Sequence, residues 1–358
     1  MEKVIILPQD QLSDWDDFVH NHPNGWLCHL SSWQRVLNSC VRINFCYFLA
    51  IRDDSSGRIA AGLPVYQTKS LTLEKKLISA PLTTIFDPLV SNREQLSALL
   101  FQALNLLKLT GSSELTIKTL KTSPWWDQTE ALKDNSFRYH YLDLSKDLET
   151  LWKQTHRSCV RQHVNKAVQK GVKVRLAENK KDLRLFYQLY SATRKRHGLP
   201  AIPYSYFETI WEIYRPLNCA YFLLAEYQQS VISFLMAFRF KDHFSAEALG
   251  WDDRFRWLTP SAITFWEAIK LAKQLDCQQF DFGRTVLANE NLIRFKRHWG
   301  SDEIEMPQYT FKRSGKRSFP ENAASLTISY KSLTSFLKGC PDFLYDRLSR
   351  FYYRNFSS

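Results

Sequence analysis

The chain has 358 residues, of which 44% are hydrophobic and 14% aromatic, with only 11 glycines and 13 prolines. This composition excludes a disordered or collagen-like chain, and the length favours two compact lobes over one domain. The formal net charge of +12 favours an anionic partner such as a nucleic acid, a nucleotide or a lipid headgroup.

Signals for targeting and for metal binding are weak. The first 18 residues hold one lysine and four consecutive apolar residues before an acidic segment, so we expect no secretory signal. No apolar run approaches the roughly 20 residues that span a bilayer. The seven cysteines form no CxxC pair, and we expect none to lie with histidines at metal-ligand spacing. We therefore predict a cytoplasmic protein with reduced thiols and no metal.

The first half of the chain alternates between hydrophobic periods of 2 and 3.6 residues, which predicts strands and helices in turn. The predicted elements are a helix over 31–40, strands over 45–52, 59–68 and 83–90, a helix over 94–109 and a strand over 114–119.

A basic helix over 147–170 is predicted to join the two halves. The elements predicted after it are a strand over 172–177, helices over 181–196 and 204–214, strands over 220–227, 231–240 and 244–250, a helix over 260–275, a strand over 278–282, a short helix, and a strand over 303–311. This order repeats that of the first half at an offset of roughly 165 residues, as expected of two similar lobes.

Basic residues are concentrated between residues 151 and 200, where thirteen Lys or Arg stand against two acids. In the predicted helix, Lys153, Arg157 and Arg161 are spaced four apart and share one face, and Lys166 and Lys170 form a second pair. Two interpretations remain open. In the first, the basic residues form a helix face that is exposed to solvent. In the second, they bind an anion, and the whole protein could be an RNA-binding protein that uses the basic helix 153–170.

A basic and aromatic loop, WDDRFRWL at 251–258, precedes the predicted helix that begins at Pro260. Thr259 is expected to cap this helix with Pro260 in its first turn. Free N–H groups at a helix N-terminus favour an anion, so this loop is a candidate phosphate cradle that includes Arg254. Ordinary surface arginines are the plainer interpretation.

The segment FDFGRTVLANENLIRFKRHWG, at 280–300, predicts a buried strand that ends at Gly283, a polar loop, and a short helix that carries Phe295 and Lys296. Its Asp-Phe-Gly also occurs in protein kinases. The sequence lacks the upstream glycine-rich loop and the His-Arg-Asp element that kinase chemistry requires, so this interpretation fails.

Four segments carry a resemblance to the FemAB-type branch of the GNAT acyltransferases. They are HLSSWQRVL at 29–37, HRSCVRQHVNKAVQKGVKV at 156–174, RKRHGLP at 194–200, and the most specific one, FWEAIKLAKQLDCQQFDFGRTVLANENLIRFKRHWG at 265–300. The resemblance implies an α+β fold of two tandem GNAT-like lobes, each a mixed, largely antiparallel sheet flanked by helices. The lobes are expected at 1–145 and 146–313, with a basic, aromatic helical tail at 314–358.

The resemblance also implies acyl or aminoacyl transfer, and it gives roles to residues in the second lobe. Lys296 is expected to stabilise the developing oxyanion or a nearby phosphate. Arg284 is expected at the strand end and beside a cleft, with Asp281 holding Arg284 or a helix N-terminus, or serving only as a structural ion pair. The residues expected to bind substrate or phosphate, or to carry protons, are Arg157, Arg161, Lys166, Arg254, Glu290 and His298.

The implied donor is acyl-CoA or aminoacyl-tRNA, and the implied acceptor is an anionic lipid- or nucleotide-linked precursor of the cell envelope, peptidoglycan or exopolysaccharide. A catalytically inactive GNAT scaffold is the further alternative. The sequence departs from the family in two places. AEYQQSVISF, at 225–234, is a tight hairpin where transfer-RNA-dependent members often carry a helical arm, and FDPLVSN, at 86–92, replaces the usual acidic element and leaves Asp87 as the nearest acid.

The tail mixes Leu, Phe and Tyr with Lys and Arg. It is expected either to lie on the acidic inner surface of the membrane or to pack on one lobe through Phe343, Leu344, Leu348 and Tyr352.

Overall fold

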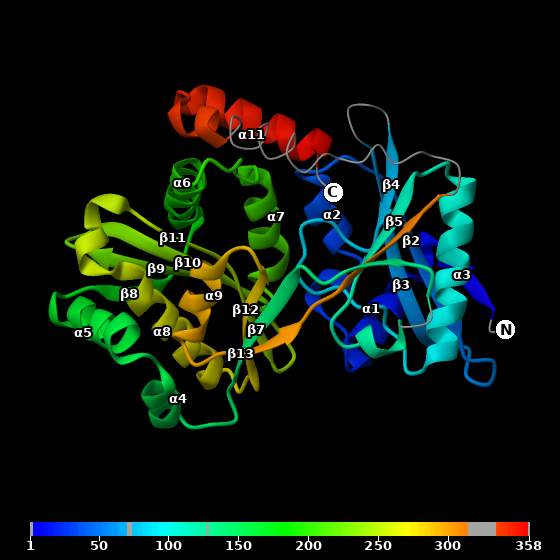
Figure 1. Ribbon diagram of the computed structural model, residues 1–358, viewed down its shortest axis with the longest axis horizontal. Helices are drawn as coiled ribbons and strands as arrows, with labels where there is room; N and C mark the ends of the chain where they lie inside the picture. Colours follow the sequence, from blue (N-terminus) through cyan, green and yellow to red (C-terminus); the bar gives the residue numbers. More distant parts are fainter. Residues whose placement is uncertain (1–2, 70–73, 127–128, 314–333, 357–358) are drawn as a thin grey trace. The chain divides into compact units, whose positions relative to one another are not determined.

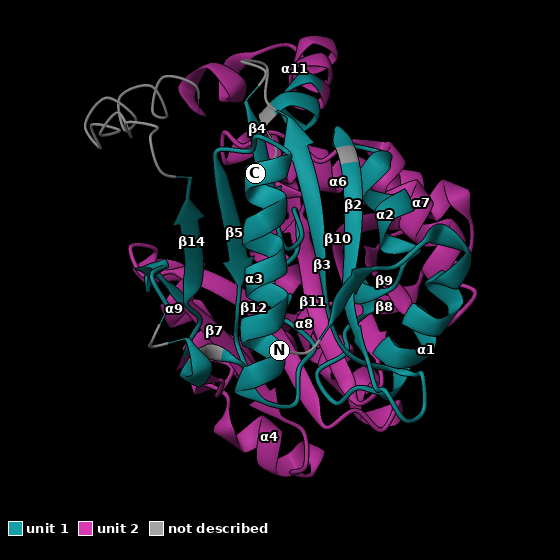
Figure 2. Ribbon diagram, turned by 90° about the vertical axis from the view of Figure 1, so that its right-hand side faces the viewer, with its two compact units in different colours: residues 1–137, 305–321, 351–358 teal, residues 138–304, 322–350 magenta. Residues whose placement is uncertain are grey.

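The computed structural model describes residues 3–69, 74–126, 129–313 and 334–356 (Figure 1). The chain forms two compact units, coloured separately in Figure 2. The first comprises Met1–Phe137, Glu305–Glu321 and Phe351–Ser358, and the second comprises Arg138–Ile304 and Asn322–Arg350. This division differs from the expected continuous ranges 1–145, 146–313 and 314–358, because the strand over 308–312 belongs to the sheet of the first unit.

Within the described residues, the first unit contains a seven-stranded sheet in the order β1-β2-β3-β4-β5-β14-β6. Its strands are β1 (Val4–Ile6), β2 (Ile43–Arg52), β3 (Ile59–Lys69), β4 (Lys75–Ile78), β5 (Glu114–Lys118), β6 (Leu132–Asp134) and β14 (Gln308–Lys312). Its helices are α1 (Leu12–Asn21), α2 (Trp33–Asn38) and α3 (Arg93–Leu109), with 3-10 turns at Gln9–Gln11, Leu27–His29 and Ser123–Trp125.

Helix α3 packs on this sheet because its apolar residues recur at helical spacing. Asn92 caps it by accepting from the amide of Gln95 at 2.9 Å, and Leu99 and Ala103 are fully buried in the core. The aromatic rings of Tyr309 and Phe311, on β14, join the same core. This burial explains why β14 inserts between β5 and β6.

The second unit contains, in its described part, a seven-stranded sheet in the order β13-β7-β12-β11-β10-β9-β8. The strands are β7 (Phe137–Asp143), β8 (Lys173–Leu176), β9 (Ala220–Tyr227), β10 (Ser230–Phe240), β11 (His243–Trp251), β12 (Gln279–Val286) and β13 (Asp302–Glu305). The helices are α4 (Leu148–Gln154), α5 (Gln162–Gln169), α6 (Lys180–Arg196), α7 (Tyr204–Tyr214), α8 (Pro260–Gln274), α9 (Glu290–Arg297) and most of α11 (Asp342–Phe356), with a π turn at Arg157–Arg161 and a 3-10 turn at Asp253–Leu258.

Alternation along β9 and β10 divides the core of the second unit between the two faces of its sheet. Phe234 packs edge-on against Phe186 of α6, with ring centroids 4.7 Å apart, whereas its neighbour Leu235 joins the cluster around Phe265 of α8. Helices α6 and α8 therefore cover opposite faces, as Figure 1 shows. The expected α+β architecture of two GNAT-like lobes is confirmed, and the predicted strands and helices from 172 to 275 are found within two residues of their expected bounds.

Three predicted elements are wrong. No strand forms over 83–90, where a single bridge joins Leu89 to Gly62. In this segment, hydrogen bonds from side chains take the place of strand pairing. The Asp87 carboxylate accepts from the amides of Leu120 and Thr122 at 2.9 Å, and Lys118 Nζ donates to the carbonyl of Thr83 at 2.7 Å. Strand β3 pairs with β2 on one side and with β4 on the other.

The predicted helix over 147–170 is broken into α4, a π turn and α5. Thr155 is extended (ψ 150°), and His156 begins the next turn by accepting from the amide of Cys159 at 3.2 Å. The predicted strand over 303–311 is also split, because Met306 and Pro307 separate β13 from β14, which enter different sheets. Proline has no N–H with which to continue a ladder.

The C-terminal helix α11 packs mainly through Tyr345, Ser349 and Tyr353, and the expected Leu344, Leu348 and Tyr352 are half-buried beside them. Tyr345 Oη donates to the carbonyl of Leu199 at 2.6 Å, and Ser349 Oγ accepts from the amide of Ala201 at 3.1 Å. Phe343, expected to pack, is 70% exposed. Residues 314–333 of the expected tail lie outside the described residues, and membrane binding by the tail stays a prediction. Among the described helices, none is both long and apolar enough to cross a bilayer.

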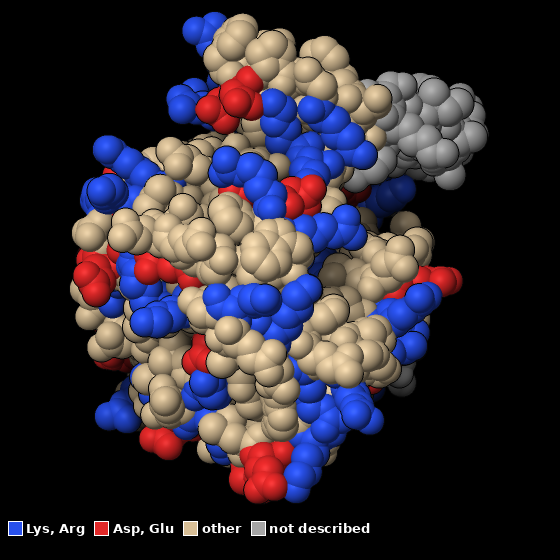
Figure 3. Space-filling model, turned by 90° about the vertical axis from the view of Figure 1, so that its left-hand side faces the viewer, with Lys and Arg blue, Asp and Glu red and all other residues tan. Residues whose placement is uncertain are grey.

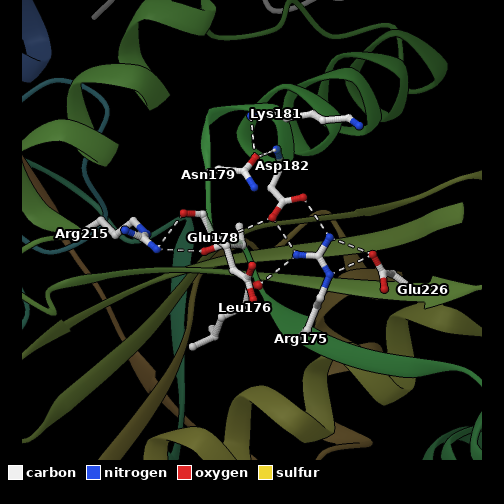
Figure 4. Close-up of polar contacts among 9 residues, drawn as sticks. Arg175, Leu176, Glu178, Asn179, Lys181, Asp182, Arg215 and Glu226 are labelled. Atoms are coloured by element: carbon white, nitrogen blue, oxygen red, sulfur yellow. Dashed lines mark hydrogen bonds and ion pairs between the residues drawn. The ribbon is translucent and has the colours of Figure 1, made fainter. Parts of the chain in front are cut away.

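An ion-pair network joins β8, α6 and β9 (Figure 4). Arg175 donates to both oxygens of Asp182 at 2.7 and 2.9 Å, and through Nε to Glu226 at 2.9 Å. Asp182, whose side chain is 8% exposed, also accepts from the amide of Glu178 at 2.9 Å. These bonds from Arg175 hold the pKa of Asp182 below its usual range.

Replacing Asp182 with asparagine is expected to lower the free energy of unfolding at pH 7 by about 2 kcal/mol, since hydrogen bonds to a charged group are lost. A carboxylate whose pKa is depressed by folding stabilises above the unfolded pKa of about 3.9, and this contribution is lost as the pH falls through the folded pKa. Urea unfolding at pH 7 and pH 3 should thus show a difference between the variant and the wild type that shrinks in acid. Glu149→Gln, which removes an exposed pair with Lys153, should change stability by at most about 0.5 kcal/mol. An equal effect of both variants would contradict the assignment.

Candidate active site in the second unit

The two central strands of the second sheet, β11 and β12, run parallel and pair over three residue pairs, from His243 with Gln279 to Ser245 with Asp281. Past these pairs each strand continues, to Trp251 and to Val286. Polar side chains gather where this pairing ends. Such a place, between the carboxyl ends of parallel strands, is a common position for a ligand site.

Asp281 is fully buried at the end of this pairing. Its Oδ2 accepts from Ser245 Oγ at 3.1 Å and lies 3.6 Å from Nε2 of His243, and its Oδ1 accepts from the amide of Gly283. Gly283 has a positive φ of 73°, which glycine tolerates, and the strand runs on to Val286 rather than ending at Gly283 as predicted.

Glu247 lies two residues beyond Ser245, on the same strand. A bulge leaves it without a partner on β10, because Met236 pairs with Ala248 and Ala237 with Ala246. Its Oε1 accepts from Ser245 Oγ at 2.7 Å. Burial, and to a smaller degree the charge of Asp281, raise the pKa of this half-buried carboxyl to about 7.

Ser245 therefore lies between two carboxyl groups, although its hydroxyl has only one proton to donate. When Glu247 is protonated it can donate to Ser245 Oγ, which in turn donates to Asp281. When Glu247 is ionised, the Ser245 hydroxyl can donate its proton to only one of the two carboxylates at a time. With a pKa of about 7, Glu247 can gain and lose a proton near neutral pH.

Tyr139, from β7, completes the buried wall of the cluster. Its hydroxyl accepts from Gln279 Nε2 at 2.9 Å and lies 3.4 Å from Nε2 of His243. Burial and the negative charge of Asp281 raise its pKa well above the usual value. Tyr139 thus stays a neutral phenol.

Lys296 reaches the cluster from α9, whose first turn is capped by Asn289. The lysine is 4% exposed, and its Nζ donates to the carbonyl of Gly283 at 2.6 Å and to that of Arg284 at 3.4 Å. Burial lowers its pKa to about 8, against the raising effect of Asp281. Lys296 therefore links α9 by hydrogen bonds to the backbone of β12, at Gly283 and Arg284, just after Asp281. It carries a positive charge at neutral pH.

The structure thus brings together Asp281, Lys296 and the backbone of Arg284 from the predicted set. Arg157, Lys166 and Glu290 are exposed, and Arg161 and the Arg284 side chain are partly buried. The side chain of Arg254 is 83% exposed and forms an ion pair with Asp252 at 2.6 Å.

The candidate phosphate cradle differs from expectation in its cap. Thr259 has a left-handed backbone (φ 51°) and makes no side-chain cap to α8. Its hydroxyl donates instead to the carbonyl of Leu258 at 2.7 Å, with the carbonyl of His163 at 3.1 Å. The first-turn amides of α8 are therefore not taken up by Thr259.

His298, predicted as a substrate-binding residue, lies at the end of α9 against His156, with ring centroids 4.6 Å apart. Burial lowers the pKa of His298, helped by the neighbouring His156 and Arg294. Cys159 lies in the same cluster. The expectation that no cysteine lies with histidines at metal-ligand spacing is therefore wrong, since His156 and Cys159 are three residues apart.

Sequence reasoning missed Ser245, Glu247, Tyr139 and His243. A signal was present in FSAEALGW, where Ser245 and Glu247 are two apart and so share one face of a strand that is otherwise apolar. A buried acid is costly unless it has a partner or a task.

The second unit thus combines a parallel pairing of β11 and β12 with helices on both faces of its sheet (Figure 1). Residues 154–297 match the family model of the acetyltransferase (GNAT) domain. No curated protein matches the sequence at a significant level.

Three solved structures show the same fold over nearly the whole chain. FemX has a TM-score of 0.69 at 15% identity, covering 87% of this chain and 97% of that one. A tandem GNAT protein from the clavulanic acid biosynthesis pathway gives 0.57 at 13%, covering 89% and 100%. The C-terminal domain of a putative lysylphosphatidylglycerol synthetase from Agrobacterium fabrum gives 0.55 at 11%, covering 93% and 98%. The predicted FemAB-like tandem GNAT fold is thereby confirmed, and the match to the family model lies within the second unit.

Proposed function

We propose that this protein is an acyl- or aminoacyltransferase whose active site is the cluster of Glu247, Ser245, Asp281 and Lys296. The observation that carries the proposal is the position of the Glu247 carboxyl, which accepts from Ser245 Oγ at 2.7 Å past the end of the β11–β12 pairing, with burial raising its pKa to about 7. A general base is most effective when its pKa lies near the working pH. The GNAT domain supports acyl transfer in general and an acyl-CoA type of donor.

In the proposed reaction, an amine or hydroxyl of the acceptor attacks the carbonyl carbon of the donor, and Glu247 takes the proton that the acceptor loses. The carbonyl oxygen gains negative charge, which a nearby cation or N–H donor stabilises. The bond to the leaving group then breaks, and the thiolate of CoA, or the ribose oxygen of a transfer RNA, departs and acquires a proton. Ser245 and Asp281 hold Glu247 in place, and Lys296 supplies positive charge beside Asp281.

The proposed acceptor is an anionic, lipid- or nucleotide-linked precursor of the cell envelope. Two similar structures support this acceptor. One is named as a putative lysylphosphatidylglycerol synthetase, and that name denotes an anionic lipid that carries an amino acid. The other, FemX, matches the fold of 87% of this chain. The net charge of +12 suits an anionic acceptor. Exopolysaccharide as acceptor, aminoacyl-tRNA as donor and attachment to the inner face of the membrane belong to the same proposal.

The RNA-binding alternative gains little from the geometry. The basic helix is interrupted at Thr155, and Lys153 forms an ion pair with Glu149 at 2.6 Å, so the bases do not form one continuous face. In Figure 3 the Lys and Arg side chains form several groups, separated by uncharged and acidic side chains.

Thermal unfolding of the full chain with CoA, acyl-CoA esters, charged transfer RNA or duplex RNA tests the proposal. We expect one donor class to raise the Tm, because a ligand at 100 times its Kd stabilises by about 2.7 kcal/mol. A small anionic donor should bind with a shallow dependence on salt, whereas an RNA-binding protein should show a steep one. If no donor raises the Tm, the inactive scaffold is the correct interpretation.

A further inference from the structure

Outside the proposed active site, two segments remote in sequence bring three metal-ligating side chains together. His156 and Cys159 flank the start of the π turn, and His298 ends α9. One ligand atom from each lies within 4.8 Å of the others. We propose that His156, Cys159 and His298 form a binding site for a divalent transition-metal ion, zinc first, with the fourth tetrahedral position open to water.

The backbone already fixes the two segments against each other. The amide of His156 donates to the carbonyl of His298 at 2.7 Å. The π turn is held by the amides of Val160 and Arg161, which donate to the carbonyl of His156 at 3.0 and 3.2 Å. Metal binding therefore requires rotation of the side chains and no change in these backbone bonds.

The donor set and the spacing fit zinc. Imidazole nitrogen and thiolate sulfur are the ligands that Zn²⁺ prefers, and the two residues of the local pair are separated by two others, as in common zinc sites. In a tetrahedral zinc site, neighbouring ligand atoms lie about 3.3–3.6 Å apart. The ligand atoms, which lie within 4.8 Å of one another, need to approach by at most about 1.5 Å. This is within reach because His156 is exposed and Cys159 and His298 are half-buried.

Polar groups around the cluster suit a cation. Helix α4 ends just before His156 and helix α9 ends at His298, and the C-terminus of a helix carries partial negative charge. Ser158 Oγ lies 3.3 Å from His156 Nδ1 and 3.9 Å from Cys159 Sγ, where it can hydrogen-bond a ligand from outside the metal shell.

Two positively charged side chains, Arg157 on the π turn and Arg294 on α9, disfavour the binding of a cation at this cluster. Arg297, on the same helix, is already paired with Glu303 at 2.8 Å. The Cys159 thiolate supplies the negative charge that offsets these bases, since a coordinating thiol loses its proton. A site built from histidines alone would lack this compensation.

Cobalt substitution of the metal-free, full-length protein tests the proposal. We expect one Co²⁺ per chain, with a thiolate-to-cobalt charge-transfer band and the visible bands of tetrahedral coordination, and displacement by Zn²⁺. Cys159→Ser should abolish the charge-transfer band. It should also weaken zinc binding by at least about tenfold, because even the loss of an outer-shell partner costs about 10- to 100-fold.

Two ligand variants keep the test separate from folding. His156→Asn retains a side-chain acceptor for the turn, since asparagine is a favoured cap, and should still lose zinc affinity, as should His298→Gln. Cys219→Ser and His20→Gln, which lie outside the cluster, should bind cobalt as the wild type does. Equal zinc affinity in the wild type and Cys159→Ser, or a charge-transfer band that disappears in Cys219→Ser instead, would overturn the proposal.

Discussion

Replacing Glu247 with glutamine is expected to lower kcat for acyl transfer by about 100- to 10,000-fold, the usual contribution of a general base. Glutamine has nearly the same shape and can still accept from Ser245 Oγ, which lies 2.7 Å from Glu247 Oε1. The substitution therefore removes the proton acceptor with little change in packing. Release of CoA thiol from the acyl-CoA ester that raises the Tm most measures the rate.

The pH profile tests the same role independently. A base acts in its ionised form, so kcat of the wild type should rise with pH through the pKa of Glu247, about 7. It should fall again above the pKa of Lys296, about 8, where the positive charge is lost. The glutamine variant should lose the rising limb and retain only a low rate. The direction matters, because a general acid with the same pKa would give a rate that falls as the pH rises.

Glu267→Gln is the matched control for this substitution. Glu267 lies on α8 of the same unit and forms a partly exposed pair with Lys270 at 2.6 Å. We expect it to leave kcat and the pH profile unchanged. A Glu247→Gln protein that folds normally and keeps the wild-type rate would exclude Glu247 as the base and would leave the proposed mechanism without its main support.

The sequence predicted the second unit well because its elements are strongly periodic and bounded by local signals. Pro260 marks the start of α8, and the apolar runs of β9 and β10 are long enough to be distinguished from helices. Lys296 and Asp281 were found through the family resemblance of the segment that holds them. Their neighbours Ser245 and Glu247 lie on another strand, β11. The local sequence pattern does not predict that β11 and β12 are adjacent in the sheet.

The errors have a common physical origin in long-range contacts. The helix predicted over 147–170 breaks where His156 bonds to His298, a contact that joins distant segments. Strand β14 follows the second unit in sequence but lies in the sheet of the first unit, because Tyr309 stacks on Trp126 with ring centroids 4.5 Å apart. Neither partner can be inferred from hydrophobic periodicity, which reports only the face of an element that is buried.

Replacing Lys296 with methionine is expected to lower kcat by about 100-fold or more while the protein stays folded. A fixed charge near the reacting centre contributes about this much to transition-state stabilisation. Lowering the pKa of Lys296 from its usual 10.5 to about 8 corresponds to about 3 kcal/mol against the charged form. Methionine removes this cost together with the bonds to the carbonyls of Gly283 and Arg284, so the two effects on stability oppose each other.

The pH dependence of stability separates the lysine charge from its hydrogen bonds. Between pH 8 and 10 the native state has released the Lys296 proton and the unfolded state still holds it, so the wild type gains stability as the pH rises. Urea unfolding should show this gain as about 2 kcal/mol relative to Lys296→Met over that range. A flat difference would mean that Lys296 titrates as an exposed lysine does.

Lys273→Met provides the control for the activity of the Lys296 variant. Lys273, on α8, also donates from Nζ to a backbone carbonyl, that of Leu144, at 2.6 Å. Losing a lysine-to-carbonyl bond there should change stability but leave kcat as it is. If both variants lose activity to the same extent, Lys296 acts by holding α9 in place, and its charge has no part in the reaction. If only Lys296→Met loses activity, the positive charge beside Asp281 is what the chemistry requires.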